Sequence, residues 1–166
     1  HSSRRSPVPL CFVLLISFLG GFASLQARPA SIPESGELDL TPFLEVLPVQ
    51  GKNLSFEDIQ ANRYQGAFKG GFRYQPGFGF GKGQVWARFE VESREPLLVE
   101  SANPWIDTVD LYCSGPGAWT HETSGDLYTF GSRKTAHRNV VLTIPGNAKP
   151  TVCYIAYTTG GTIQIP

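Results

Sequence analysis

VWARFEVE, residues 85–92, is the stretch that decides the fold class of this chain. Its residues alternate, with Val85, Ala87, Phe89 and Val91 in one apolar set and Trp86, Arg88, Glu90 and Glu92 between them. A period of two is typical of a half-buried β-strand, because successive side chains of a strand point to opposite faces. We therefore expect Val85, Ala87 and Phe89 to point together into a core.

Strand-like runs follow this stretch at short intervals. Turn signals rich in glycine and proline separate them, and the chain holds 18 Gly and 13 Pro. Short strands at this spacing predict an all-β fold, specifically an antiparallel jelly-roll β-sandwich over about residues 38–166. The further strands are expected at residues 97–100, 108–113, 119–122, 138–144, 152–157 and 162–165.

The region before residue 85 reads differently. Ser55-Phe-Glu-Asp58 is similar to a capping box and predicts one short helix over about 56–62. Residues 28–37 are polar and rich in proline, which indicates a flexible, unpacked leader. The glycine-rich stretch 77–83 precedes a strand and not a helix, so we expect a loop at the rim of the sheet and no phosphate-binding loop.

The N-terminus has the features of a secretory signal peptide. Arg4 and Arg5 precede an apolar run over residues 10–19, and small residues follow at 20–27. We expect a signal peptide over 1–27 with cleavage after Ala27, the alternatives being cleavage after Ala23 or an uncleaved anchor. The chain begins with His and not Met, so we expect it to be a fragment of a longer reading frame.

Cleavage would leave two cysteines, Cys113 and Cys153, each in a predicted strand. Cysteines in an exported chain can form a disulfide, and the alternative is a pair of buried thiols. The sequence leaves both open.

Composition excludes several classes of function. The length of 166 residues suits one domain, and 14 Lys+Arg balance 14 Asp+Glu, which argues against nucleic-acid binding. His121 and His137 are too far apart for a metal-binding motif, and no Gly-x-Ser-x-Gly is present. We therefore expect no cofactor, no metal and no catalysis.

Several short motifs, in order, resemble a known family. They are Val85-Trp-Ala-Arg-Phe89, Asp107-Thr-Val-Asp-Leu-Tyr112, Gly125-Asp126, and Arg133 followed by His137-Arg-Asn139. This order resembles extracellular domain 2 of the bacterial seven-transmembrane receptors with diverse intracellular signalling modules (7TMR-DISM), over about residues 38–166. The chain departs from the family at Tyr154–Tyr157, where an Arg is usual.

The resemblance implies a jelly roll similar to carbohydrate-binding modules, outside the cytoplasmic membrane. It also implies a membrane tether, through a seven-helix region beyond this sequence, and a cytoplasmic kinase, cyclase or phosphatase output. The domain itself would sense a small polar or carbohydrate-like ligand as a periplasmic part of a receptor. The alternatives are a secreted carbohydrate-binding module and a dimerisation or interaction sandwich without a ligand, so a homodimer stays open.

We expect the ligand to bind in a groove on one sheet face. Aromatic rings stack on the apolar faces of sugars, and charged groups bind hydroxyls or carboxylates. Each residue also has a structural alternative: Trp86 can pack within the sheet, and Arg88 and Arg133 can form fixed salt bridges. The expected groove consists of Trp86, Arg88, Asp110, Tyr112, Arg133 and His137.

Overall fold

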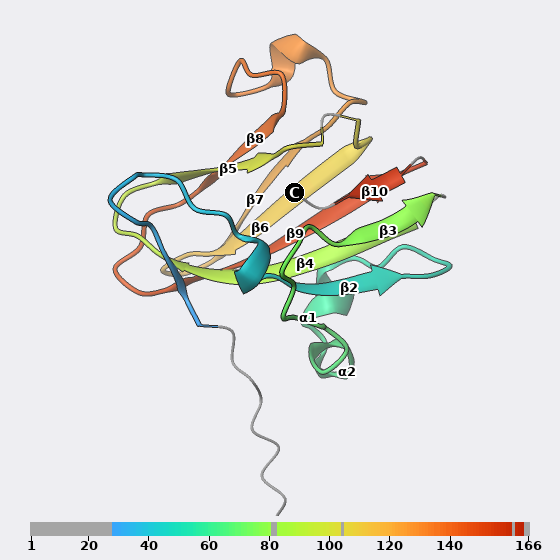
Figure 1. Cartoon of the computed structure of the whole chain (residues 1–166), viewed down its shortest axis with the longest axis horizontal. Helices are drawn as coiled ribbons and strands as arrows, with labels where there is room; N and C mark the ends of the chain where they lie inside the picture. The colour runs from blue at the N-terminus through green and yellow to red at the C-terminus, as the bar shows by residue number, and fades with distance from the viewer. Residues whose placement is uncertain (1–27, 81–82, 104, 161, 165–166) are drawn as a thin grey trace, which may run out of the picture.

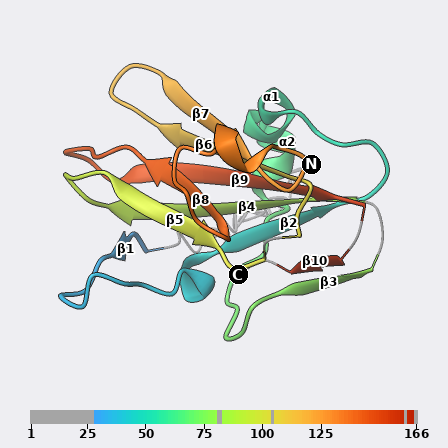
Figure 2. The same ribbon diagram turned by 90° about the horizontal axis from the view of Figure 1, so that it is seen from above.

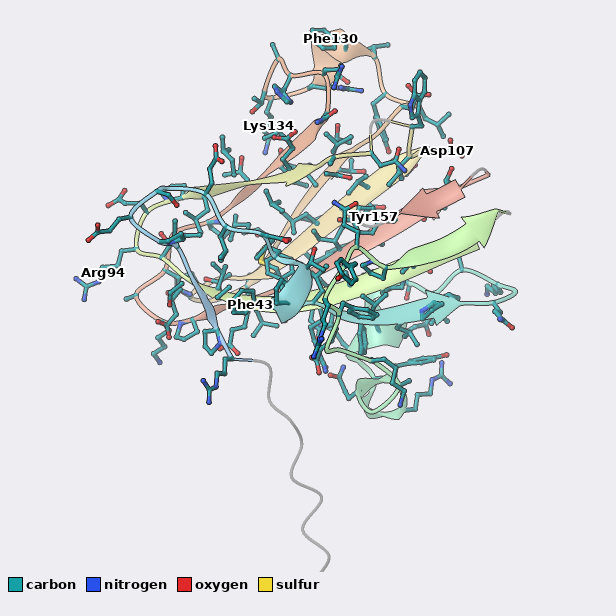
Figure 3. All side chains as sticks on the ribbon, in the orientation of Figure 1. Phe43, Arg94, Asp107, Phe130, Lys134 and Tyr157 are labelled. Carbon is teal, nitrogen blue, oxygen red and sulfur yellow. A yellow bond between two sulfur atoms is a disulfide. The ribbon has the colours of Figure 1, made fainter. Side chains whose placement is uncertain are left out.

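The structure is a computed structural model that describes residues 28–80, 83–103, 105–160 and 162–164 (Figure 1). The expected signal peptide lies outside the described residues. The strands are β1 (Ala30–Ser31), β2 (Glu45–Val49), β3 (Gly77–Phe80), β4 (Gly83–Glu92), β5 (Leu97–Ser101), β6 (Thr108–Ser114), β7 (Trp119–Ser124), β8 (Val140–Ile144), β9 (Thr151–Thr159) and β10 (Thr162–Gln164). The helices are α1 (Phe56–Gln60) and α2 (Asn62–Gln65), with 3-10 turns at Thr41–Phe43 and Phe130–Ser132. Phe43 and Phe130, one in each of these turns, are labelled in Figure 3.

The strands form two packed layers. The large sheet has the order β1-β4-β9-β6-β7, and β2 pairs with β4 on the same edge as β1. β5 and β8 form the second layer by themselves within the described chain. β3 and β10 form a separate antiparallel pair, in which Phe80 faces Thr162, and in Figure 2 this pair lies below β4 and β9. The prediction of an all-β sandwich is confirmed, and its jelly-roll connectivity stays a prediction.

The core lies between the two layers. Val85, Ala87 and Phe89 are at most 2% exposed and point into it together, so the predicted strand register is confirmed. The second layer contributes Val140, Leu142 and Ile144 to the same core. In both layers every second side chain along the strand points into the core, as expected for strands packed on one face.

A disulfide joins the two central strands of the large sheet. Cys113 on β6 and Cys153 on β9 face each other in the antiparallel register, with their Cα atoms 4.2 Å apart. Both residues are fully buried in the core. The sequence left open a disulfide or a pair of buried thiols, and the structure contains the disulfide.

The short helix α1 covers the opposite face of the large sheet. Ser55 accepts a hydrogen bond from the backbone N–H of Asp58, and the Asp58 carboxylate accepts one from the Ser55 N–H, which completes the expected capping box. Phe56 and Ile59 are buried against the sheet. α1 is shorter than expected, because Ala61 adopts an extended conformation, and the unexpected helix α2 follows.

The segment expected to be an unpacked leader is packed in part. β1 pairs in parallel with the end of β4, and Ala30 is fully buried. Ile32, Leu38 and Leu40 also pack against the core. The physical reason is that β5 and β8 are too few to cover the large sheet, so the N-terminal segment buries the remaining apolar surface. In Figure 2, β1 and the segment that follows it lie below β4, and the helices α1 and α2 lie above the large sheet.

The glycine-rich stretch also differs from the expectation. Gly77–Phe80 form strand β3 instead of a loop, and they pair with β10. Pairing gives the backbone hydrogen-bond partners that a loop would have to find elsewhere.

Candidate functional site

Four of the six residues of the expected groove lie on the outer face of the large sheet, opposite the core. β9 separates the pair Trp86 and Arg88 on β4 from the pair Asp110 and Tyr112 on β6. The registers align them in two rows across the sheet. One row is Glu45, Arg88, Tyr154, Tyr112 and His121, and the other is Leu47, Trp86, Ala156, Asp110 and Thr123.

Trp86 is buried beneath α1 and is 1% exposed. Its indole N–H donates to the side-chain oxygen of Gln84 at 2.9 Å. The same oxygen accepts from the N–H of Leu54 at 2.9 Å, and the Gln84 amide donates to the Leu54 carbonyl at 3.2 Å. A buried indole needs such a partner. Trp86 therefore packs the chain before α1 onto the sheet and presents no surface to a ligand while α1 stays in place.

Arg88 is fixed by several partners on the same face. Its Nη2 lies 2.7 Å from a carboxylate oxygen of Glu45, which faces it directly on β2. Its Nη1 donates to the side chain of Gln65 at 2.6 Å, and its guanidinium lies 4.6 Å from the centre of the Phe68 ring. This is the cross-strand salt bridge that the sequence analysis held as the structural alternative.

Tyr112 stands in a stack of three rings. It lies between Phe56, with ring centres 4.2 Å apart, and His121, with ring centres 4.3 Å apart, and all three rings are nearly parallel. The ring nitrogen Nε2 of His121 lies 2.9 Å from a carboxylate oxygen of Asp110. Burial raises the pKa of Tyr112, and the carboxylates of Asp110 and Glu57 raise it further, so the Tyr112 hydroxyl stays neutral.

Trp119 opens this cluster to solvent, with 39% of its surface exposed. Its ring meets Phe56 edge-on at 5.0 Å between centres and lies 5.8 Å from Tyr154. Sequence reasoning missed Trp119 as a site residue. The signal was present, because Trp119 and His121 are two residues apart on one strand and so share a face. We call Asp110, Tyr112, Trp119 and His121 the β6–β7 platform.

Arg133 and His137 lie in the connection between β7 and β8. Arg133 donates to the carbonyls of His137 and Arg138 at 3.1 and 3.2 Å. Within the described chain its guanidinium holds this connection through carbonyls and forms no ion pair. A hollow of about 210 Å³ beside β7 is lined by both Arg133 and His121, so this connection adjoins the platform at the sheet edge.

Over the described ranges, no group of three or more His, Cys, Asp or Glu residues is placed to hold a metal ion. No helix in this part of the chain is long and apolar enough to span a membrane.

Comparison with known proteins adds one finding. The sequence model of a family described as 7TMR-DISM extracellular 2 matches residues 41–166. No curated protein matches the chain. The matched range begins at the first 3-10 turn and includes the whole β6–β7 platform.

Proposed function

The chain belongs to the 7TMR-DISM extracellular 2 family, which is a family of extracellular sensor domains of seven-transmembrane receptors, and from this we propose that it binds a small polar, carbohydrate-like ligand for such a receptor. The domain would work in the periplasm and be tethered to the cytoplasmic membrane by a receptor region outside this sequence. It would bind its ligand and leave the chemistry to an output domain.

The observation that carries the ligand class is the partly exposed ring of Trp119 beside a polar pair. Sugars present apolar C–H faces that stack on aromatic rings, and their hydroxyls bind carboxylate and imidazole groups. On the platform, Trp119 supplies the ring, and Asp110 and His121 supply the polar groups 2.9 Å from each other. The stack of Phe56 and Tyr112 beneath holds these groups in place.

The proposed ligand site is centred on Trp119, which was not part of the expected groove. Asp110 and Tyr112 remain in it, and Arg133 borders it through the hollow beside β7. Trp86 and Arg88 support the platform from the covered part of the same face. Ligand binding would therefore depend on Trp86 only through the position of α1.

The test is calorimetric titration of the purified chain with neutral sugars such as glucose, galactose and cellobiose. We expect Trp119→Ala to weaken binding about tenfold, which corresponds to about 1.4 kcal/mol. Asp110→Asn should weaken it as well, because a charge-assisted hydrogen bond is lost.

Trp105→Ala is the matched control, because Trp105 is 76% exposed and lies outside the platform. It should leave sugar binding unchanged. If no sugar binds, or if the Trp119 and Trp105 variants bind equally well, the platform is not a sugar site.

A further inference from the structure

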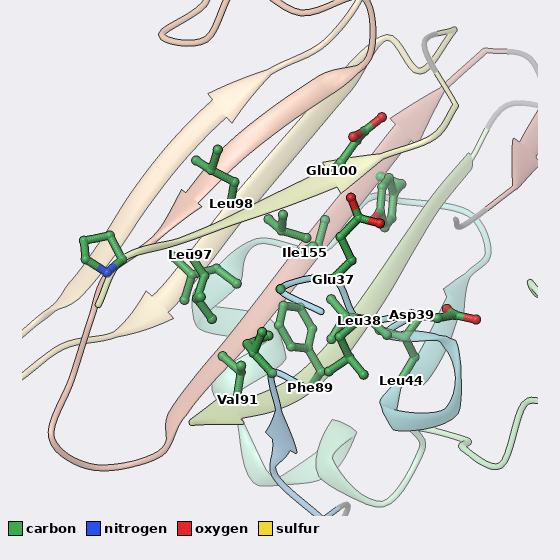
Figure 4. A pocket seen from close by; sticks show the side chains of 17 residues that line it. Glu37, Leu38, Asp39, Leu44, Phe89, Val91, Leu97, Leu98, Glu100 and Ile155 are labelled. Carbon is green, nitrogen blue, oxygen red and sulfur yellow. The ribbon is translucent and has the colours of Figure 1, made fainter. Parts of the chain in front are cut away.

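Two hollows of the described chain differ in what they offer a ligand. The larger one, of about 590 Å³ between residues 36–40 and β5, has the apolar floor residues Phe89, Val91 and Ile155, and each of them is at most 3% exposed (Figure 4). The smaller one, of about 210 Å³ beside β7, is lined by side chains that include Thr123 and Arg133. Its volume is below the range of about 300–1,000 Å³ that is typical of whole small-molecule sites. The smaller hollow can therefore hold one part of a ligand that continues along β7.

Three side chains of β7 share the outer face of the large sheet. Trp119, His121 and Thr123 follow one another at every second residue, and His121 and Thr123 face Tyr112 and Asp110 on β6. A strand rises about 3.3 Å per residue, so the Cα atoms of Trp119 and Thr123 lie about 13 Å apart. This span exceeds the length of a single hexose unit, and the smaller hollow lies beside its His121 and Thr123 part.

A second exposed ring, Tyr128, lies at the far end of these side chains. The Thr123 hydroxyl donates to the Tyr128 hydroxyl at 3.4 Å, and 39% of Tyr128 is exposed, as for Trp119. The turn that brings Tyr128 back to β7 begins at Gly125, which has a φ of +144° and packs so closely on the Asp107 carbonyl that a Cβ atom would clash. The N–H of Tyr128 then donates to the Gly125 carbonyl at 3.3 Å. The backbone therefore holds Tyr128 beside Thr123.

Together these residues combine the two kinds of group that bind a sugar chain. Rings stand at both ends, and the imidazole of His121, whose side chain is 48% exposed, and the hydroxyl of Thr123 lie between them. Sugars stack their apolar faces on rings, and their hydroxyls bind polar side chains. The set is called the β7 row and consists of Trp119, His121, Thr123 and Tyr128.

We propose that the β7 row binds a linear oligosaccharide of about three or more sugar units. One unit stacks on Trp119, a middle unit binds His121 and Thr123 at the hollow, and a later unit stacks on Tyr128. A single sugar reaches one ring only, whereas a chain reaches both and gains from each. The inference rests on the proposed function, because both use Trp119 and His121, and it deepens that function by naming a chain of sugars as the ligand.

The experiment is calorimetric titration of the purified chain with two disaccharides, cellobiose and maltose, and with the corresponding tetrasaccharides, cellotetraose and maltotetraose. The two series differ in linkage and so in the shape of the chain. We expect the tetrasaccharide of at least one series to bind about five- to tenfold more tightly than its disaccharide, because only the longer chain contacts both rings. Equal affinity of tetrasaccharide and disaccharide in both series would overturn the proposal.

Tyr128→Ala tests the second ring, and Tyr74→Ala is its matched control. Tyr74 is 86% exposed and lies outside the β7 row. Tyr128→Ala should weaken tetrasaccharide binding about five- to tenfold and leave disaccharide binding unchanged, whereas Tyr74→Ala should change neither. Tyr128→Phe keeps the ring and should bind as the parent does, which separates stacking from the contact with Thr123.

The outcomes distinguish this inference from the proposed function. If Trp119→Ala weakens disaccharide binding and Tyr128→Ala leaves tetrasaccharide binding unchanged, the platform is a sugar site and the β7 row does not extend it. If none of the four saccharides binds, both proposals fail.

Discussion

At the scale of single residues, Arg88 shows how one sequence position can suit two roles. Its alternating strand predicts that it points away from the core, and this is correct. The groups that meet it there, Glu45 and Gln65, come from 43 and 23 residues earlier in the chain. Because those groups bind it, the guanidinium of Arg88 has a structural role and is not available to a ligand.

Replacing Arg88 with Leu should therefore destabilise the fold. Arg88 and Glu45 each expose 20% of their side chains, so removing the guanidinium of Arg88 leaves the carboxylate of Glu45 poorly solvated and without its partner. We expect a loss of about 1–3 kcal/mol in the free energy of unfolding, measured by urea denaturation.

Arg63→Leu provides the comparison. Its ion pair with Asp58 spans 3.5 Å, with 66% and 42% of the two side chains exposed, so its loss should cost at most about 1 kcal/mol. Equal effects of the two substitutions would show that the Arg88 pair is no more than a surface contact.

At the scale of elements, two short carboxylate caps fix the region that covers the sheet. Asp58 caps α1, and Asp39 accepts from the N–H of Thr41 at 2.8 Å at the start of the first 3-10 turn. Hydrogen bonds from Ser55 hold the pKa of Asp58 below its ordinary value of 3.8, and hydrogen bonds from Thr41 do the same for Asp39.

These caps predict a loss of stability in acid. A carboxyl whose pKa is lower in the folded chain stabilises the fold above its unfolded value of 3.8, and this contribution disappears as the pH falls through the folded-state pKa. Asp58→Asn should be less stable than the parent at pH 7, and the difference should shrink as the pH falls below 3.8 and through the lower folded-state pKa. Urea denaturation at both pH values measures this.

Asp126→Asn is the control, because the Asp126 side chain makes no hydrogen bond among the described residues. Its effect should not change in the same way with pH. A difference between parent and Asp58→Asn that stays constant as the pH falls from 7 to well below 3.8 would contradict the capping role.

At the scale of the whole molecule, the disulfide ties the centre of the large sheet. Cys113 and Cys153 are 40 residues apart in sequence, and the bridge closes a loop that contains β7 and β8. A cross-link of this kind lowers the entropy of the unfolded chain.

The double variant Cys113→Ala, Cys153→Ala should lose about 2–4 kcal/mol of unfolding free energy, which thermal denaturation without reductant can detect. Adding a reductant should lower the Tm of the parent chain and leave that of the variant unchanged. If the reductant has no effect on the parent, the two cysteines are not bridged in solution.

The sequence by itself determined the strands that follow residue 83, the inward face of β4 and the cap of α1, but not β1, β2 or β3. These features depend on neighbours within a few residues: the period of two in VWARFEVE and the Ser55–Asp58 spacing. It also carried the ordered motifs of the family, which the match over residues 41–166 confirms.

Only the tertiary structure decided which outward-facing residues stay accessible. Trp86 and Tyr112 share one face, yet α1, which begins 30 residues before Trp86, covers the indole, while β7 leaves Trp119 open beside Tyr112. The covering of the core beside β5 likewise depends on a second layer of two strands and on an N-terminal segment that packs where a leader was expected. Alternation along a strand is a local property, but the covering of its outer face is set by contacts between segments far apart in the chain, which no local pattern encodes.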